Sequence, residues 1–379
     1  MRLSRGVSLL IISAILLVVI GSIILYYTGR TDLPGIDLSH LQRGAIAGHI
    51  ESLRSQDAPA RKKAAAILWQ MGTDAKEATP ALLEVAKDSD PQVREAAVKA
   101  LGRTGQGTQD AIPALIEALK DDEAAVRAAA ARSLAESWRL GATGRPGAAR
   151  PPAGRGSPAE RPEQPAANGA PGPSPNKLPP AYEGLAQKAV PVLTKDLHDT
   201  DEHVRSCAAE ALTETGPLAE PAVPDLMLLL QKDTDSSVRL QATLALYNIG
   251  PGAKAAVPVL VEKLRSEEAD GVRVNTAAAL GMIRASPETV VPALVETFLT
   301  DKHPDARNCA MKSIGQFGPD AQFAIPLLQK AAKDPKNQQS EATMQNINRL
   351  LDYLKKYAQR SGKDRTKNLS PSSQDPSRK

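Results

Sequence analysis

Aromatic residues are scarce in this chain, and their scarcity limits how its core can be built. Only 3% of the 379 residues are aromatic although 42% are apolar, so alanine and leucine must fill the interior. Small side chains let neighbouring helices approach closely, which favours helices packed in layers. The sequence also has only two cysteines, which excludes a disulfide framework.

A net positive charge is lacking where the sequence repeats. The whole chain has a formal net charge of +4, but residues 1–30 carry +3, residues 140–180 carry +3 and residues 353–379 carry +6, which leaves −8 for the rest. An acidic body argues against a folded basic surface for nucleic acid, so we predict no specific nucleic-acid partner.

Charge of either sign is absent from Val7 to Tyr27, VSLLIISAILLVVIGSIILYY. At about 1.5 Å per residue a helix over this run is about 31 Å long, enough to span a bilayer. A cleaved signal peptide is the alternative, but it has a shorter apolar core and a small-residue cleavage site, and YYTGRTDLPG offers no convincing one. Arg2 and Arg5 precede the run, so we predict a single-pass anchor in the cell membrane, with its N-terminus in the cytoplasm and the remaining chain outside.

A unit of about 34 residues recurs after this segment. The same proline returns in seven units, at Pro80, Pro113, Pro191, Pro224, Pro258, Pro292 and Pro326. An arginine returns with it, at Arg61, Arg94, Arg127, Arg205, Arg239, Arg273 and Arg307. Such a period is typical of a solenoid, in which a small unit buries its apolar face only against its neighbours.

Each unit contains two patterns of helical spacing. In AIPALIEALK, Ile112, Leu115 and Leu119 fall on one helix face. In PQVREAAVKALGRTG, Ala97 and Leu101 share a face, and equivalent small and large residues return in the other units. A glycine follows many second helices, where we expect a left-handed C-terminal residue: Gly72, Gly105, Gly216, Gly250 and Gly318.

Acidic residues stand just before several second helices. Asp90, Asp201 and Asp235 are predicted N-caps, and Pro91 occupies the first position of its helix. A calcium site is the alternative, but the spacing lacks a 12-residue loop that ends in a bidentate glutamate. We expect the recurring arginines to pair with acids of their own or the neighbouring turn, as a structural ladder along one edge: Arg94, Arg127, Arg205, Arg239, Arg273 and Arg307.

The unit resembles the short HEAT repeat, of the variety also seen in phycobilin-lyase-type HEAT proteins. The resemblance is carried by ATPALLEVAKDSDPQVREAAVKALGRTG and AVPVLTKDLHDTDEHVRSCAAEALTETG, and it extends from Gly44 to Leu351 with degenerate first and last units. It implies an all-α fold, an α-solenoid of about eight two-helix repeats, to which the sequence adds one N-terminal transmembrane helix.

The resemblance implies a scaffold that binds another protein, with no catalytic residue, cofactor or metal, and we expect a monomer. A chromophore lyase acting on a bound tetrapyrrole or protein is the alternative, although no catalytic residue suggests itself. A HEAT-repeat hydroxylase would use paired His-Glu motifs, and this chain has no His-Glu dipeptide. Cys207 and Cys309 occupy a small-residue position of the repeat, three units apart, so both are expected to pack between helices without forming a disulfide.

The spacing of the seven recurring prolines reveals an interruption of the repeats, because Pro113 and Pro191 are separated by more than two periods. The inserted residues are rich in Pro, Gly and Ala and are predicted to be disordered, with Trp138 covering the third unit beside them. Whether the stack continues past the insertion or divides into two lobes is open. The predicted division is a stub and anchor at 1–30, a linker at 31–43, repeats at 44–139, the insertion at 140–180, repeats at 181–352 and a basic disordered tail at 353–379.

Two positions of the repeat, one and five residues after the recurring arginine, suggest where a partner binds. When the units are aligned, the residues at each position form a column. They are mostly polar in the early units and apolar in the fifth and sixth. We expect an exposed apolar patch there, and the alternative is that neighbouring helices or the insertion cover it. The predicted patch consists of Leu240, Leu244, Val274, Ala278 and Met282.

Overall fold

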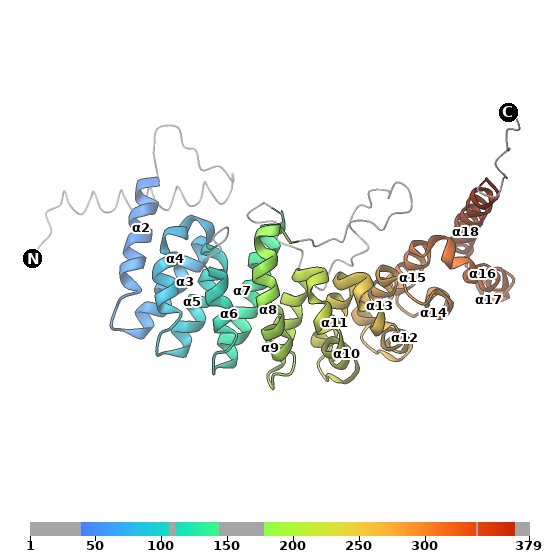
Figure 1. Ribbon diagram of the computed structural model, residues 1–379. Helices are drawn as coiled ribbons and strands as arrows, with labels where there is room; N and C mark the ends of the chain where they lie inside the picture. Colours follow the sequence, from blue (N-terminus) through green and yellow to red (C-terminus); the bar gives the residue numbers. More distant parts are fainter. Residues whose placement is uncertain (1–38, 106–110, 144–177, 339, 368–379) are drawn as a thin grey trace, which may run out of the picture.

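The structure is a computed structural model that describes residues 39–105, 111–143, 178–338 and 340–367. These residues form helices and no strand, and the helices pair into eight units along one row, from α2 at one end to α18 at the other (Figure 1). The first helices of the units are α2 Ser39–Ser52, α4 Thr79–Val85, α6 Ala111–Ala118, α8 Pro180–Asp196, α10 Val223–Lys232, α12 Val257–Ser266, α14 Pro287–Thr300 and α16 Ala324–Ala332. The second helices are α3 Ala58–Met71, α5 Pro91–Thr104, α7 Ala124–Thr143, α9 Glu202–Thr215, α11 Ser236–Ile249, α13 Asp270–Ile283, α15 Pro304–Gln316 and α18 Glu341–Lys367, the last preceded by the short α17 Pro335–Gln338.

The core follows the repeated columns of the sequence. Ala97 and Leu101 of α5 are both 0% exposed, as expected of positions that face the next unit. Each second helix packs against the second helices on either side, so the small residues determine how closely the layer is spaced. The all-α repeat solenoid is confirmed.

Aspartates begin the second helices as predicted. Asp90 Oδ1 accepts hydrogen bonds from the backbone N–H groups of Gln92 at 2.8 Å and Val93 at 3.2 Å. Asp201 and Asp235 cap α9 and α11 in the same way. The side chains satisfy amide groups that have no partner within the helix.

The glycines after the second helices are only partly as expected. Gly216 has φ 58° and ψ −132°, a conformation open to glycine but not left-handed helical, whereas Gly105 has φ −78°. A 3₁₀ helix follows four of the second helices and leads into the next unit: η1 Gly72–Ala78, η4 Gly216–Ala222, η5 Gly250–Ala256 and η6 Gly318–Phe323. The expectation of a left-handed residue at Gly105 is wrong, and Gly216 needs glycine for a different backbone conformation.

The stack continues past the insertion. Helix α7 packs directly against α9, and Arg127 Nε donates to Asp199 Oδ2 at 2.8 Å, so the two halves do not form separate lobes. The expected insertion boundary at residue 140 needs correction, because α7 has no helix-ending glycine at Trp138 and continues to Thr143. Trp138 itself is 0% exposed. Residues 144–177 lie outside the described residues.

The C-terminal boundary also needs correction. The tail predicted to be disordered from residue 353 is helical as far as Lys367, because α18 contains no proline and continues from Lys355 to Arg360 through residues that mostly favour helices. Leu350, Leu351 and Leu354 of this helix are buried, and the helix packs against α15, η6 and α16. Residues 368–379 lie outside the described part of the chain.

The predicted membrane span, residues 7–27, also lies outside the described residues. Among the residues that the structure describes, one stretch, Ser236–Ser266, is long and apolar enough to cross a membrane by length and composition. It comprises α11, η5 and α12 of the solenoid, and 67% of its most apolar window is buried, as expected of core helices.

Candidate functional site

A ladder of ion pairs runs along the turns that precede the second helices. Arg205 Nε and Nη2 donate to the two carboxylate oxygens of Asp233 at 2.6 and 3.1 Å, while Nη1 donates to the carbonyls of Asp199 at 2.9 Å and Thr200 at 3.1 Å. Each arginine therefore joins its own turn to the next one. The equivalent pairs are Arg61–Asp88, Arg94–Asp121, Arg127–Asp199, Arg239–Glu267 and Arg273–Asp301.

The carboxylates of the ladder also shape their own turns. Asp88 Oδ1 accepts a hydrogen bond from the backbone N–H of Asp90 at 2.9 Å, and the hydrogen bond from Arg61 is the main cause that lowers the pKa of Asp88. The ladder thus holds neighbouring units at a fixed distance along one edge, which is a structural rather than a catalytic role.

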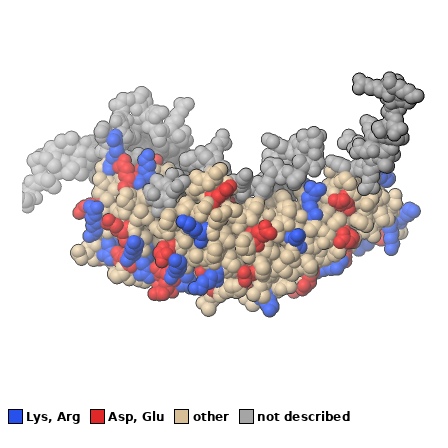
Figure 2. All heavy atoms as spheres, viewed as in Figure 1, with Lys and Arg blue, Asp and Glu red and all other residues tan. Residues whose placement is uncertain are grey.

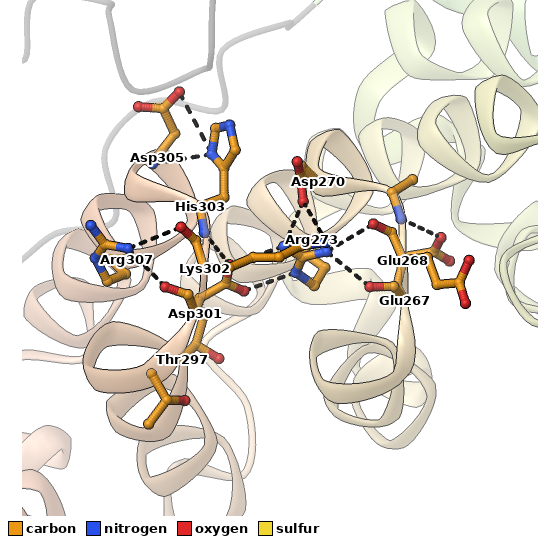
Figure 3. Close-up of polar contacts among 12 residues, drawn as sticks. Glu267, Glu268, Asp270, Arg273, Thr297, Asp301, Lys302, His303, Asp305 and Arg307 are labelled. Atoms are coloured by element: carbon orange, nitrogen blue, oxygen red, sulfur yellow. Dashed lines mark hydrogen bonds and ion pairs between the residues drawn. The ribbon is translucent and has the colours of Figure 1, made fainter.

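The last arginine of the ladder differs from the others. Arg307 Nη1 donates to the carbonyls of Asp301 at 2.8 Å and Lys302 at 3.2 Å, whereas no carboxylate of the described residues pairs with it. Figure 3 shows the contrast with Arg273, whose guanidinium reaches both its own turn and the carboxylate of Asp301. The ladder therefore ends at the seventh unit.

An open groove of about 800 Å³ crosses the second helices of the first four units, α3, α5, α7 and α9. We call it the inner groove. Six of its lining residues are alanines, whose small side chains leave the helix backbones close to the surface. These alanines are Ala66, Ala96, Ala124, Ala125, Ala128 and Ala129.

Three exposed cations line the inner groove, one from each of three successive helices. Lys62 Nζ of α3 donates to Gln92 Oε1 at 2.8 Å, Lys99 of α5 pairs with Glu95 on the same helix, and Arg132 Nη2 of α7 lies 3.4 Å from Cys207 Sγ. All three side chains are exposed to solvent. Lys62 and Arg132 therefore contact uncharged partners, whereas the charge of Lys99 is offset by Glu95.

The carboxylates of the groove are less accessible. Asp201 caps α9, where it accepts from the backbone N–H of His203 at 2.7 Å, and Glu95 is half-buried beside Lys99. Glu136 is half-buried as well, and burial raises its pKa above the usual range for glutamate. The groove therefore presents both signs, with three exposed cations beside three half-buried carboxylates.

An aromatic side chain stands at one end of the groove. Trp69 of α3 is 38% exposed, and the guanidinium of Arg103 lies 4.9 Å from the centre of its ring. This cation–π contact holds the indole in place while leaving part of it open to solvent. Figure 2 shows positive and negative side chains interspersed over the face in view.

The predicted apolar patch is not an exposed surface. Leu244, Val274 and Ala278 are 4%, 5% and 9% exposed, because adjacent second helices pack together there. Leu240 and Met282 are half-buried. The expectation of an accessible patch of five residues is therefore wrong. The same two columns are exposed at Lys62, Lys99 and Arg132 in the early units and at Asn308 and Lys312 in the seventh.

Neither cysteine is placed for chemistry. Cys207 is 2% exposed and Cys309 is 4% exposed, and the two cysteines form no disulfide. Burial raises the pKa of Cys207, which keeps it a thiol at neutral pH. Within the described residues there is no group of three or more His, Cys, Asp or Glu side chains that could hold a metal ion.

One buried carboxyl group in the fourth unit has an unusual environment. Asp196, near the end of α8, is 6% exposed, and its Oδ2 has no hydrogen-bond partner. Burial, followed by the nearby charge of Asp199, raises its pKa to about 7. The residues that hold the equivalent position in the second and third units, Val85 and Ala118, are apolar. An alignment of the units could therefore have pointed to this aspartate.

The comparisons with known proteins now decide the family. HEAT repeats match residues 46–135, 182–247 and 257–347, which is more than half of the chain. The chain belongs to the HEAT-repeat family. A search among curated proteins finds no match to this HEAT-repeat chain.

Solved structures resemble the chain in fold. Importin beta matches with a TM-score of 0.51 and 14% identity over 85% of this chain, which spans 42% of the importin chain. YibA of Escherichia coli matches with a TM-score of 0.49 and 17% identity over 86% of this chain and 99% of YibA. A designed armadillo repeat protein in complex with the peptide (KR)4 matches with a TM-score of 0.44 and 20% identity over 63% of this chain and 99% of the designed chain. At such identities the likeness to importin beta shows the fold alone.

Proposed function

We propose that this HEAT-repeat protein is a scaffold that holds a segment of another protein in the inner groove. The observation that carries the proposal is the groove itself, which crosses four successive second helices and offers alanines, exposed cations and the exposed face of Trp69. Repeat solenoids commonly use such extended surfaces to bind proteins. No observation favours the chromophore-lyase alternative.

The proposal includes the membrane. Residues 7–27 would anchor the chain, with the N-terminus in the cytoplasm and the solenoid outside it, where one copy would position its partner near the bilayer. The support is the uncharged length of this segment and the two arginines before it.

Site-specific photocrosslinking in intact cells tests the scaffold role. A photoreactive residue at Ala66 or Ala125, both exposed in the groove, should give the same adduct with one protein. The control is Gln187, an exposed residue of the first helix α8. Equal capture at Gln187, or no protein adduct at either groove position, would contradict the proposal.

A further inference from the structure

We infer that the projecting end of α18, residues 355–367, binds an anionic lipid bilayer, so that the solenoid is held to the membrane at both ends of its row. We call these residues the basic extension. The inference rests on the membrane anchor in the proposed function and adds a second point of membrane contact. Its basis is the edge of the solenoid from which α18 projects, the charge of the extension and its lack of an apolar face.

The start of α2 and the end of α18 lie at the same edge of the solenoid. The two helices of a unit run in opposite directions, so the first helices begin and the second helices end at the edge opposite the arginine ladder (Figure 1). We call this the 3₁₀ edge, because η1, η4, η5 and η6 lie along it. The chain therefore enters α2 at Ser39 and leaves α18 at Lys367 on one side of the molecule, at opposite ends of the row.

Helix α18 continues beyond the 3₁₀ edge. Tyr353 Oη donates a hydrogen bond to the carbonyl of Gly315 at 3.3 Å, beside the end of α15, and α18 packs against η6. Tyr353 therefore lies level with the edge. At about 1.5 Å per residue, the rest of the helix, which ends at Lys367, projects about 20 Å past it.

The basic extension carries charge almost entirely of one sign. It has six basic residues and one acidic residue, Asp364, which give a net charge of +5. Lys355 and Lys356 are exposed, and no ion pair joins either of them to another described residue. The only apolar residues of the extension are Tyr357 and Ala358, so it lacks the apolar stripe with which a helix packs against another protein surface. Its recognition must therefore be mainly electrostatic.

A bilayer is the partner that this position favours. The predicted anchor ends at Tyr27, and the segment from there to Ser39 extends at most about 40 Å, so the 3₁₀ edge lies within reach of the membrane surface. An anionic surface strengthens binding roughly fivefold for each Lys or Arg close to it, within a Debye length of about 8–10 Å. The anchor also keeps lipid at a high effective concentration near the extension. Nucleic acid attracts basic residues as well, but the anchor brings only a bilayer to this edge.

Energy transfer to the bilayer tests the inference with the full-length chain. The chain is reconstituted into vesicles of phosphatidylcholine, alone or with about 30% phosphatidylglycerol, that contain an acceptor-labelled lipid. A donor dye is attached through Ser361→Cys, since both native cysteines are buried. We expect transfer to be at least about twofold more efficient in the anionic vesicles, and the increase to disappear in about 1 M salt, where the Debye length falls to about 3 Å.

A charge-neutralised variant and a matched control locate the effect. Neutralising four residues of the basic extension should abolish the increase: Lys355→Gln, Lys356→Gln, Arg360→Gln and Lys363→Gln. The control neutralises four exposed lysines near the ends of first helices, at the ladder edge, and should retain the increase: Lys87→Gln, Lys120→Gln, Lys232→Gln and Lys302→Gln. Equal circular-dichroism melting curves will show that both variants fold.

Three results would overturn the inference. They are equal transfer in the two kinds of vesicle, equal losses in the variant and its control, and loss of the transfer when a DNA duplex is added at an equal concentration of phosphate. The last result would make nucleic acid the preferred partner of the basic extension.

The proposed anchor fails separately, as measured by flotation of the chain with vesicles. Flotation with both compositions but equal energy transfer overturns only the contact made by α18. Flotation with anionic vesicles alone, lost in the charge-neutralised variant, supports that contact and contradicts the anchor at residues 7–27. Flotation with neither composition contradicts both.

Discussion

Replacing Asp196 by asparagine should remove a pH-dependent loss of stability at the joint between the third and fourth units. Asp196 is 6% exposed, its Oδ2 has no partner, and its pKa is raised from 3.8 to about 7. The folded protein therefore binds more protons than the unfolded chain between those values, and the free energy of unfolding falls as the pH rises through this window. The difference between the two pKa values corresponds to about 4 kcal/mol in the free energy of unfolding, of which about 3 kcal/mol is lost between pH 5 and pH 8.

Asparagine resembles the protonated acid in shape and stays neutral. We expect Asp196→Asn to gain stability relative to the wild type as the pH rises from 5 to 8, by about 3 kcal/mol, and to gain no more above that range. Repeat proteins open locally, so hydrogen exchange of amides in α8 and α9 at matched pH is the suitable assay, supported by thermal melting of the whole chain.

A second variant makes this prediction sharper. Asp196→Val installs the residue found at Val85 in another unit and should give the same pH dependence as asparagine. The titration of histidines and of the other carboxyl groups contributes equally to the stability of variant and wild type. It therefore cancels from the difference, because each variant is compared with the wild type at one pH. A constant difference between variant and wild type from pH 5 to pH 8 would refute the reasoning.

The ladder, the buried columns and the anchor give three further predictions. Arg205→Ala should lower the free energy of unfolding by roughly 3 kcal/mol, because it leaves the 3%-exposed side chain of Asp233 unpaired. Arg307→Ala, which breaks no ion pair with a described residue, should cost less than about 1 kcal/mol in the same denaturation experiment, and equal costs would contradict the ladder. Leu244→Asp should lower the free energy of unfolding by at least about 3 kcal/mol and Leu240→Asp by much less, since only Leu244 is buried. Thermal melting measures both changes, and a well-folded Leu244→Asp protein would argue against that packing. Protease added outside spheroplasts should digest the solenoid, and its full protection while an external control is cleaved would refute the proposed orientation.

The fold was largely predictable because its main contacts repeat. A small residue at the Ala97 position and a large apolar residue at the Leu101 position return in seven units, so a single register predicts the helix pairs and their stacking. The N-caps were equally predictable, because Asp90 acts on amides only two and three residues away. Local interactions and strict periodicity can both be recognised from the sequence without knowledge of the tertiary structure.

The candidate site was less predictable, because exposure depends on the neighbouring helix. The same two columns contain Leu244, which is buried between packed helices, and Lys99, whose long side chain reaches solvent. Periodicity places both residues on one face but does not determine which of them is covered. The cation–π contact of Trp69 with Arg103 joins two units, and no local pattern predicts it.

The helix ends departed from expectation for a related reason. No glycine interrupts α7 at Trp138, so the helix continues into the residues assigned to the insertion. In α18 the burial of Leu350 and Leu354 supports a helix that continues beyond Tyr353. Polar composition alone led to the prediction of disorder there, although the residues from Lys355 to Arg360 are mostly good helix formers.

Lysine footprinting of the full-length chain with its crosslink-identified partner tests the central claim most directly. Acetylation measured by mass spectrometry compares Lys62 and Lys99 in the inner groove with Lys188 and Lys254, which are exposed elsewhere. The account predicts that the partner protects Lys62 and Lys99 and leaves Lys188 and Lys254 as reactive as in the free protein. Unchanged reactivity of Lys62 and Lys99 in the complex would contradict binding in the groove.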